Sequence, residues 1–123
     1  MPKKVLLIDG DPFWQKFCQI RLRETCGLDV ICSSNVVDAR LAVAQHAPAV
    51  ILMEMILPDQ DGFSYLEELK KHPEHSKIPV IVISALSHHG HVSHCAKLGA
   101  TGYFNKNMLN RTDPLIQLVK KFI

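Results

Sequence analysis

The sequence predicts an α/β fold in which helices cover both faces of a doubly wound parallel β-sheet. Five short apolar runs alternate with five stretches of helical spacing, and only short turn signals separate them. Runs such as Val5–Ile8 and Ala49–Met53 are apolar at every position, which is typical of strands buried on both faces. The chain has 123 residues, which suits one domain over residues 1–123.

The first strand, Val5–Ile8, leads into a helix that we expect to lie between Asp11 and Gly27. Asp11 can cap its N-terminus, because a carboxylate accepts hydrogen bonds from the free amides there, and Pro12 suits the first helical position. Gly27 can end the helix in a left-handed conformation. Apolar residues recur inside it at helical spacing, namely Phe13, Phe17 and Ile20, with Trp14 and Cys18 beside them.

A second strand is predicted over Leu28–Cys32, followed by a helix that Ser34 or Asn35 caps. This helix must stop before Pro48, since proline disfavours a helical residue in front of it. Its apolar positions are Val36, Val37, Ala39, Leu41 and Val43.

The third strand, Ala49–Met53, leads to Glu54 and then to a loop over Leu57–Gly62 that contains proline, glycine and two aspartates. A helix over Phe63–Lys71 follows. Within it Glu67 and Lys71 are four residues apart, a spacing that lets them pair on the exposed face.

The remaining elements follow the same alternation. A fourth strand is predicted over Pro79–Ile83, a weaker helix over His89–Leu98 with Gly99 after it, and a fifth strand over Thr101–Phe104. Asp113 and Pro114 begin a last helix that carries Leu115, Leu118, Val119 and Phe122.

Composition and charge exclude several function classes. Apolar residues make up 47% of the chain, and the formal net charge is +2, so nothing favours binding to nucleic acid or to an anionic membrane. The four cysteines show no metal-ligand spacing, and we expect reduced thiols. We find no apolar run long enough for a signal peptide or a membrane span. We therefore expect a cytoplasmic protein.

Polar residues follow four of the predicted strands: Asp9, Glu54, Ser84 and Lys106. In a doubly wound sheet the functional crevice lies at the carboxyl ends of the strands. A carboxylate there can hold Mg²⁺ or accept a phosphoryl group, while a lysine and a serine hydroxyl contact the phosphoryl oxygens. Each residue alone could simply terminate its strand, but the four together favour a phosphoryl-handling site.

Three segments resemble the receiver domains of response regulators, the CheY-like family, and the resemblance covers essentially the whole chain. The segments are Met55–Gly62 after the third strand, Ile78–Ala85 at the fourth strand and Leu98–Lys106 at the fifth. The resemblance implies a flavodoxin-like (βα)5 receiver fold with strand order 2-1-3-4-5. It also implies a two-component or phosphorelay signalling role.

The resemblance assigns a role to individual residues. Asp9 matches one member of an acidic pair that holds Mg²⁺, and the backbone carbonyl of Ile56 matches a further metal ligand. Ser84 and Lys106 match the hydroxyl and lysine that handle the phosphoryl group, and Tyr103 matches an aromatic residue that reorients on activation.

Three positions depart from the family pattern. Glu54 stands where the family has its phosphoacceptor aspartate, Gly10 replaces the second acidic metal ligand, and Asn107 replaces a frequent proline. The extra methylene of Glu54 moves its carboxylate by about 1 Å, a shift that can cost ~100-fold in a positioned reaction. Gly10 offers no side-chain oxygen, although Asp11 can substitute weakly. We expect Mg²⁺ binding to be weak and phosphorylation to be impaired or absent.

Glu54 has two alternative roles at this stage. Its longer side chain can reach towards Ser84 or Lys106 and imitate the phosphorylated state with a single charge. Alternatively, it forms an ordinary ion pair with Lys106 and biases nothing. Either role is compatible with a natural residue or with one introduced by engineering.

Three hypotheses for function follow. The first is an atypical receiver that binds kinases, phosphotransferases or output domains through the region around residues 88–122, with a weak homodimer on the same face. The second is a phosphorylatable switch that uses Glu54 with help from Asp11. The third is an enzyme, because Ile8–Asp11 resembles the aspartate pair of haloacid-dehalogenase-type phosphatases. Phe13 and the scarcity of acidic residues after Lys106 count against the third, so no turnover enzyme is expected.

A histidine-rich segment, Ser87–Cys95, offers another candidate site. His91 and His94 lie one helical turn apart with Cys95 adjacent, which invites a zinc interpretation. The absence of a matching second pair favours a solvated, pH-sensitive stretch or a protein contact instead.

Overall fold

Strands and helices alternate along the chain as the sequence predicts. The structure is a computed structural model that describes residues 3–85, 89–108 and 113–123. In chain order the elements are β1 (Lys4–Ile8), α1 (Pro12–Cys26), β2 (Asp29–Ser33), α2 (Val36–His46), β3 (Val50–Met53), α3 (Gly62–Lys71), β4 (Val80–Ser84), α4 (His89–Lys97), β5 (Gly102–Asn105), the 3-10 helix η1 (Lys106–Met108) and α5 (Asp113–Lys120).

The five strands form one parallel sheet in the order β2-β1-β3-β4-β5, which confirms the predicted topology. The register brings the carboxyl ends of the strands to the same edge. Ile8 at the end of β1 lies beside Ser33 of β2 and Met53 of β3, and Ser84 of β4 lies beside Asn105 of β5. The residues that follow these strands therefore meet at one edge of the sheet.

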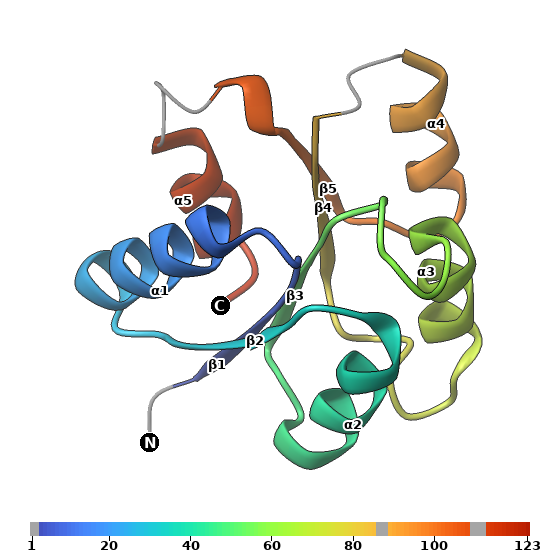
Figure 1. Cartoon of the computed structure of the whole chain (residues 1–123), viewed down its shortest axis with the longest axis horizontal. Helices are drawn as coiled ribbons and strands as arrows, with labels where there is room; N and C mark the ends of the chain where they lie inside the picture. The colour runs from blue at the N-terminus through green and yellow to red at the C-terminus, as the bar shows by residue number, and fades with distance from the viewer. Residues whose placement is uncertain (1–2, 86–88, 109–112) are drawn as a thin grey trace.

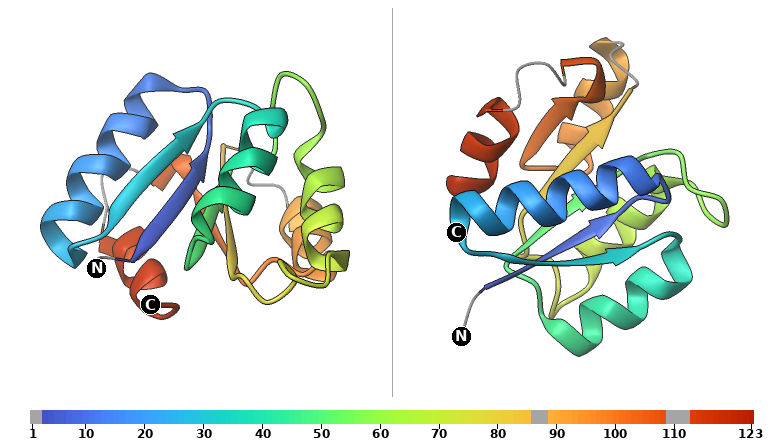
Figure 2. Two further views of the ribbon diagram at one scale, coloured as in Figure 1. Left: turned by 90° about the horizontal axis from the view of Figure 1, so that it is seen from below. Right: turned by 60° about the vertical axis from the view of Figure 1, so that its left-hand side comes forward.

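Helices cover both faces of the sheet. Helices α1 and α5 lie on one face, and α2, α3 and α4 lie on the other (Figures 1 and 2). Each face has its own apolar core, since alternate residues along a strand point in opposite directions. Leu6 and Ile8 belong to the core under α2 and α3, whereas Val5 and Leu7 belong to the core under α1 and α5.

Side-chain caps set the helix starts close to the predicted positions. The carboxylates of Asp11 and Asp61 accept hydrogen bonds from the amides of residues 13 and 63, and the side chain of Asn35 accepts one from Asp38 N. Gly27 ends α1 with φ 66° in the left-handed region. The prediction of Asp113 as a cap concerns a side chain outside the described part of the chain, and Phe122 lies beyond the end of α5.

Helices α1 and α2 bury only some of their apolar residues. In α1, Trp14 and Cys18 are buried together with Leu22, whereas Phe13 and Ile20 are 52% and 46% exposed. In α2, the buried residues are Val36, Ala39, Ala42 and Val43, and Val37 and Leu41 are exposed. These four residues are exposed because both helices are apolar over more than the stripe that the sheet can cover.

No helix within the described ranges is both long and apolar enough to cross a membrane. All four cysteines are free. Burial raises the pKa of the Cys18 thiol to about 12, so this residue is a neutral part of the core at physiological pH.

Candidate functional site

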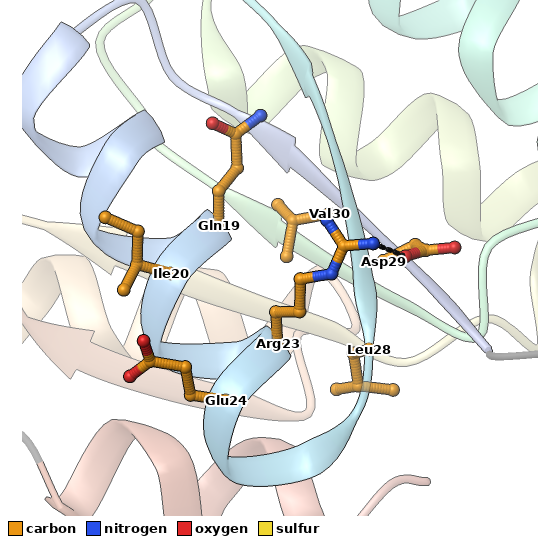
Figure 3. Close-up of a pocket in the computed structure, with 7 residues that line it drawn as sticks. All are labelled: Gln19, Ile20, Arg23, Glu24, Leu28, Asp29 and Val30. Carbon is orange, nitrogen blue, oxygen red and sulfur yellow. Dashed lines mark ion pairs between the residues drawn. The ribbon is translucent and has the colours of Figure 1, made fainter.

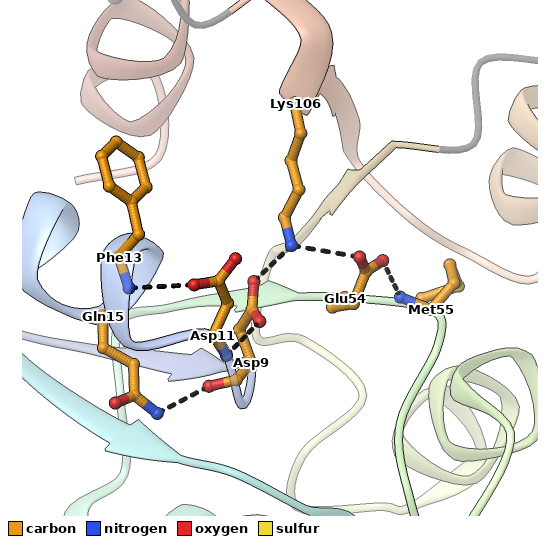
Figure 4. Close-up of polar contacts among 7 residues, drawn as sticks. All are labelled: Asp9, Asp11, Phe13, Gln15, Glu54, Met55 and Lys106. Atoms are coloured by element: carbon orange, nitrogen blue, oxygen red, sulfur yellow. Dashed lines mark hydrogen bonds and ion pairs between the residues drawn. The ribbon is translucent and has the colours of Figure 1, made fainter.

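The side chains predicted from the strand ends meet at the carboxyl edge of the sheet. Asp9 follows β1, Glu54 follows β3, Ser84 is the last residue of β4, and Lys106 follows β5. Asp9, Glu54 and Ser84 are all buried. Figure 4 shows Lys106 descending from η1 towards the two carboxylates.

Lys106 contacts both acidic residues at once. Its Nζ atom lies 2.7 Å from Asp9 Oδ2 and 3.1 Å from Glu54 Oε1. The contact with Glu54 is also a hydrogen bond, whereas the contact with Asp9 is an ion pair without good hydrogen-bond alignment. One ammonium group therefore lies between two buried carboxylates (Figure 4).

The surroundings of Lys106 stabilise its charged form. Burial pushes the pKa of Lys106 down, but the adjacent carboxylates of Asp9 and Glu54 outweigh burial and raise it above its usual value. The Nζ atom also lies 5.4 Å from the centre of the Trp14 ring, within the range of a cation–π contact. Trp14 is itself buried, so its fluorescence can report on this site.

Both oxygens of Glu54 have partners. While Oε1 faces Lys106, Oε2 accepts a hydrogen bond of 2.6 Å from the backbone N–H of Met55. The extra methylene of glutamate lets the carboxylate turn back onto the peptide that follows it. The predicted contact with Lys106 is present, and Met55 N is a partner that the sequence did not indicate.

Gly62 holds the peptide that binds Glu54. Its N–H donates a 2.9 Å hydrogen bond to Met55 O. A Cβ atom at position 62 would lie 2.5 Å from Met55 Cα and 2.9 Å from Glu54 O, closer than atoms can pack. Only glycine permits this approach, which fixes the Met55 N–H beneath the Glu54 carboxylate.

Asp9 is held by its neighbours on β1 and α1. Its Oδ1 atom accepts a 2.9 Å hydrogen bond from Asp11 N, and its carbonyl accepts a 2.7 Å bond from Gln15 Nε2. Gln15 also contacts the Ser34 hydroxyl at 3.3 Å and so links the ends of β1 and β2. Its role was not predicted, because a glutamine in the first turn of a helix carries no specific signal.

Asp11 caps α1 in this structure. Its Oδ1 atom accepts a 2.9 Å hydrogen bond from Phe13 N at the start of α1, as its capping position predicts. Gly10 beside it is exposed. A Cβ atom added at Gly10 would lie 3.5 Å from Ser34 O, an ordinary contact, so the backbone can accept an aspartate there.

Ser84 and Tyr103 form the other half of the site. Burial raises the pKa of the Tyr103 hydroxyl, and a hydrogen bond with the Ser84 side chain acts in the opposite direction. Tyr103 is half-buried on β5, and Ser84 is fully buried on β4. Tyr103, the aromatic residue expected to reorient on activation, therefore forms a hydrogen bond with Ser84, the expected hydroxyl residue.

The loop after β3 carries Ile56, which was predicted as a metal ligand, and Asp59, whose contacts were not predicted. Ile56, predicted to offer a backbone carbonyl to a metal, has a side chain that is 67% exposed. Asp59 accepts hydrogen bonds of 2.9 and 3.0 Å from Val36 N and Val37 N at the start of α2. These amides lower the Asp59 pKa. A cap from another segment leaves no local sequence pattern.

The described residues contain no group of three or more His, Cys, Asp or Glu side chains placed to hold a metal ion. In the histidine-rich segment, His91 and His94 both contact the Phe63 ring, at 6.1 and 4.9 Å between centroids. Cys95 is buried against Met55, with 3.7 Å between sulfur atoms. Ser87 and His88 lie outside the described residues, as does the side chain of His89. These contacts favour packing between α3 and α4 over a zinc site.

Two hollows of the surface lie away from these polar residues. One of about 500 Å³ lies between α1 and β2, where Arg23 and Asp29 pair at 3.7 Å (Figure 3). Another of about 250 Å³ lies between α2 and α3. Neither is lined by Asp9, Glu54 or Lys106. We place the candidate site at the strand ends because buried charges converge there, whereas these hollows are shallow and open.

The model of the response regulator receiver domain matches residues 5–120. Among relatives, the polar-differentiation response regulator DivK of Brucella anthropi is 29% identical over 106 residues, which cover 86% of this chain and 85% of DivK. The response regulator Rre1 of Synechocystis is 25% identical over 68% of this chain, which spans only 36% of Rre1. The chain thus matches about a third of that longer relative.

Solved structures show the same fold. The chemotaxis protein CheY4 of Vibrio cholerae superposes with a TM-score of 0.87 over 100% of both chains at 17% identity, a likeness that concerns the fold alone. The Mn²⁺-bound form of the response regulator Rcp1 has a TM-score of 0.78 and 25% identity, covering 85% of this chain and 81% of Rcp1.

Proposed function

Because the chain belongs to the response regulator receiver domain family, we propose that it is an atypical receiver that signals by protein contact and without metal-dependent phosphorylation of Glu54. The observation that carries this proposal is the Lys106 ammonium between the carboxylates of Asp9 and Glu54. A divalent cation bound to a pair of carboxylates compensates their negative charge. Here the ammonium group of Lys106 supplies positive charge at that position.

The residues present fit Mg²⁺ poorly. Magnesium demands near-octahedral oxygen coordination, yet Asp9 Oδ2 and Glu54 Oε1 face an ammonium group and Glu54 Oε2 accepts the Met55 N–H. Gly10 has no side-chain oxygen, and one oxygen of Asp11 caps α1. Although Rcp1 has a Mn²⁺-bound form, we derive no step through a metal for this chain.

Glu54 is also a poor phosphoryl acceptor. An attacking carboxylate oxygen needs a free lone pair directed at phosphorus, and a misplacement of about 1 Å can cost ~100-fold. Both Glu54 oxygens are already engaged, and the Gly62 contact keeps the Met55 peptide in place. We therefore assign Glu54 and Lys106 a structural role that keeps this edge in one state.

Partners bind, on this proposal, through α4, β5 and α5, within the region around residues 88–122. Strand β5 is paired with β4 up to Ser84 and Asn105, and Tyr103 interacts with the Ser84 side chain, so on this proposal the surface forms without a phosphoryl group. Kinases, phosphotransferases and output domains are the classes of partner that we expect. We expect no turnover chemistry, and we treat residues 1–123 as one unit.

A titration followed by Trp14 fluorescence tests the proposal. Mg²⁺ is added first and beryllofluoride, a phosphoryl analogue, second. We expect the natural chain to stay silent, while a Glu54→Asp, Gly10→Asp variant responds at millimolar Mg²⁺. The space beside Gly10 accepts the new side chain, and Trp14 lies close enough to Lys106 to report.

The two single variants serve as matched controls. If Gly10→Asp alone restores the fluorescence response, the missing metal ligand explains why the unsubstituted chain is silent. If Glu54→Asp alone restores it, the displaced carboxylate explains the silence. A response of the natural chain at millimolar Mg²⁺ would overturn the proposal and favour a phosphorylatable switch in which Asp11 assists. A colorimetric phosphatase assay with an artificial ester completes the set, since sustained turnover would contradict any receiver function.

A further inference from the structure

Acidic and basic residues are distributed unevenly along the chain. Residues 1–74 contain eleven acidic and eight basic residues, whereas residues 75–123 contain one acidic and six basic residues. The first part therefore has a formal charge of −3 and the second part a formal charge of +5, with histidines counted as neutral. No acidic residue occurs between Glu74 and Asp113, the stretch that contains β4, α4 and β5.

Three lysines of the second part have no acidic partner in the described part of the chain. Lys97 is the last residue of α4, and Lys120 and Lys121 lie at the end of α5. All three are exposed, and none forms an ion pair with a described residue. Their charge is therefore available to a partner, unlike that of Lys106 in the candidate site.

These lysines lie near the start of β5. Helices α4 and α5 lie on opposite faces of the sheet beside β5 (Figure 1), and both end at the amino-terminal edge, where β5 begins. A Cβ atom at Gly102, the first residue of β5, would lie 3.1 Å from Leu118 Cδ1, so α5 packs against this end of the strand. Lys121 comes about one turn after Leu118 on the same side of the helix.

A shallow apolar hollow accompanies the lysines. It has a volume of about 130 Å³ and lies between α4 and β5. Val92, Ala96, Ala100, Gly102 and Tyr103 are among the residues that line it, and none of its lining residues is charged. The hollow can receive one small apolar side chain of a partner.

We propose that this basic surface, formed by Lys97, Lys120, Lys121 and the hollow, binds an acidic segment of a partner protein. Carboxylates of the segment contact the lysines, and one apolar side chain enters the hollow. An apolar centre with a charged rim is the usual anatomy of an interface, and complementary charge speeds the encounter and excludes wrong partners. The inference rests on the proposed function, which places the partner surface on α4, β5 and α5, and it adds the chemistry of the partner.

Two other occupants fit the basic surface less well. In a two-fold homodimer a surface faces its own copy, so the lysines of one copy would meet those of the other, which counts against the weak homodimer on this face. A nucleic acid or an anionic membrane presents an extended array of phosphates. The acidic part of the chain repels such an array beyond the basic surface, whereas a short acidic segment contacts the basic surface alone.

Binding of a short synthetic peptide, in which glutamates flank one leucine, tests the proposal. Amide ¹H–¹⁵N spectra of the full chain, recorded with increasing peptide, should show shifts in α4, β5 and α5, and added salt should weaken the binding. Lys97→Glu and Lys121→Glu should each weaken it by at least about threefold, since each replaces an attraction with a repulsion. Circular dichroism checks that the fold is kept.

Lys16→Glu on α1 is the matched control, because it makes the same charge change at another exposed lysine. It should leave the affinity unchanged, and a peptide with glycine in place of leucine should bind more weakly to the unsubstituted chain. Equal losses for Lys97→Glu and Lys16→Glu, or shifts that lie outside α4, β5 and α5, would overturn the proposal.

The competing occupants have their own outcomes. Tighter binding of single-stranded RNA or of phosphatidylglycerol vesicles through the same lysines would overturn the acidic protein segment as the occupant. Shifts of the same amides with protein concentration alone would do so in favour of a second copy. The peptide titration needs no Mg²⁺, so a response of the chain to Mg²⁺ contradicts the proposed function and is distinguishable from a failure of the peptide to bind.

Discussion

The carboxyl edge of the sheet has two halves that are built from different interactions. In the charged half, Asp9 and Glu54 share the ammonium group of Lys106. In the hydroxyl half, Ser84 and Tyr103 share a hydrogen bond between neutral groups. Breaking the first leaves full charges buried, whereas breaking the second leaves one buried hydroxyl unpaired, and the energetic costs differ accordingly.

The two halves also differ in how fully they match the pattern that the resemblance implies, since Asp9 and Lys106 of the charged half match it and Glu54 does not. The hydroxyl half keeps the residues that the resemblance implies. Both acidic departures, Glu54 and Gly10, fall at the ends of β3 and β1 beside Lys106. In the charged half, the Lys106 ammonium lies between the carboxylates of Asp9 and Glu54.

The largest effect is expected from Lys106→Met. The substitution removes the ammonium group that lies between two buried carboxylates, and removing one partner of a buried ion pair costs about 3–5 kcal/mol. Urea unfolding followed by Trp14 fluorescence measures the loss in the free energy of unfolding. Lys71→Met is the matched control, because Lys71 forms an exposed pair with Glu67 at 2.7 Å. Lys71→Met should lower the free energy of unfolding by at most about 0.5 kcal/mol. Equal losses for Lys106→Met and Lys71→Met would contradict the greater cost expected for breaking the buried contacts.

A smaller loss is expected from Tyr103→Phe in the hydroxyl half. It removes one hydrogen bond to the fully buried Ser84, and a neutral hydrogen bond contributes about 0.5–1.5 kcal/mol. Ser84→Ala and the double variant complete a double-mutant cycle. The losses should be clearly non-additive, and strict additivity would show that the two hydroxyls do not stabilise each other.

The smallest effect is expected from alkaline pH acting on the charged half. Because the carboxylates raise the pKa of Lys106 in the folded protein, its contribution to stability is fully present below the unfolded pKa of about 10.4 and is lost as pH rises through the folded pKa. Unfolding free energies between about pH 10 and pH 12 should therefore fall more steeply for the unsubstituted chain than for Lys106→Met. Parallel curves would show that Lys106 does not titrate with folding.

Sequence patterns were sufficient for the order of the elements and for most of their ends. Asp11 and Gly27 bound α1 as predicted, because capping depends on residues within the same few positions of the chain. The buried faces of α1 and α2 were harder to predict. Phe13 and Leu41 are as hydrophobic as the buried residues of their helices. Whether such a side chain is buried depends on which side of the helix packs against the sheet.

The partners of each polar residue could not be predicted in the same way. Asp59 caps a helix that starts 23 positions earlier in the chain, and the Met55 N–H meets Glu54 only because Gly62 lets two backbone segments approach closely. Such contacts depend on distances between segments that are far apart in the sequence, and a local pattern carries no record of them.

The sequence by itself determined the alternation of strands and helices, the family, and the presence of Asp9, Glu54, Ser84 and Lys106 at strand ends. These follow from periodicity and local chemistry, which are properties of neighbouring residues. Only the tertiary structure decided that one ammonium group is shared by two carboxylates and that Val37 and Leu41 of α2 lie outside the core. Both depend on how parallel strands align at one edge and on how much helix surface a five-stranded sheet can cover.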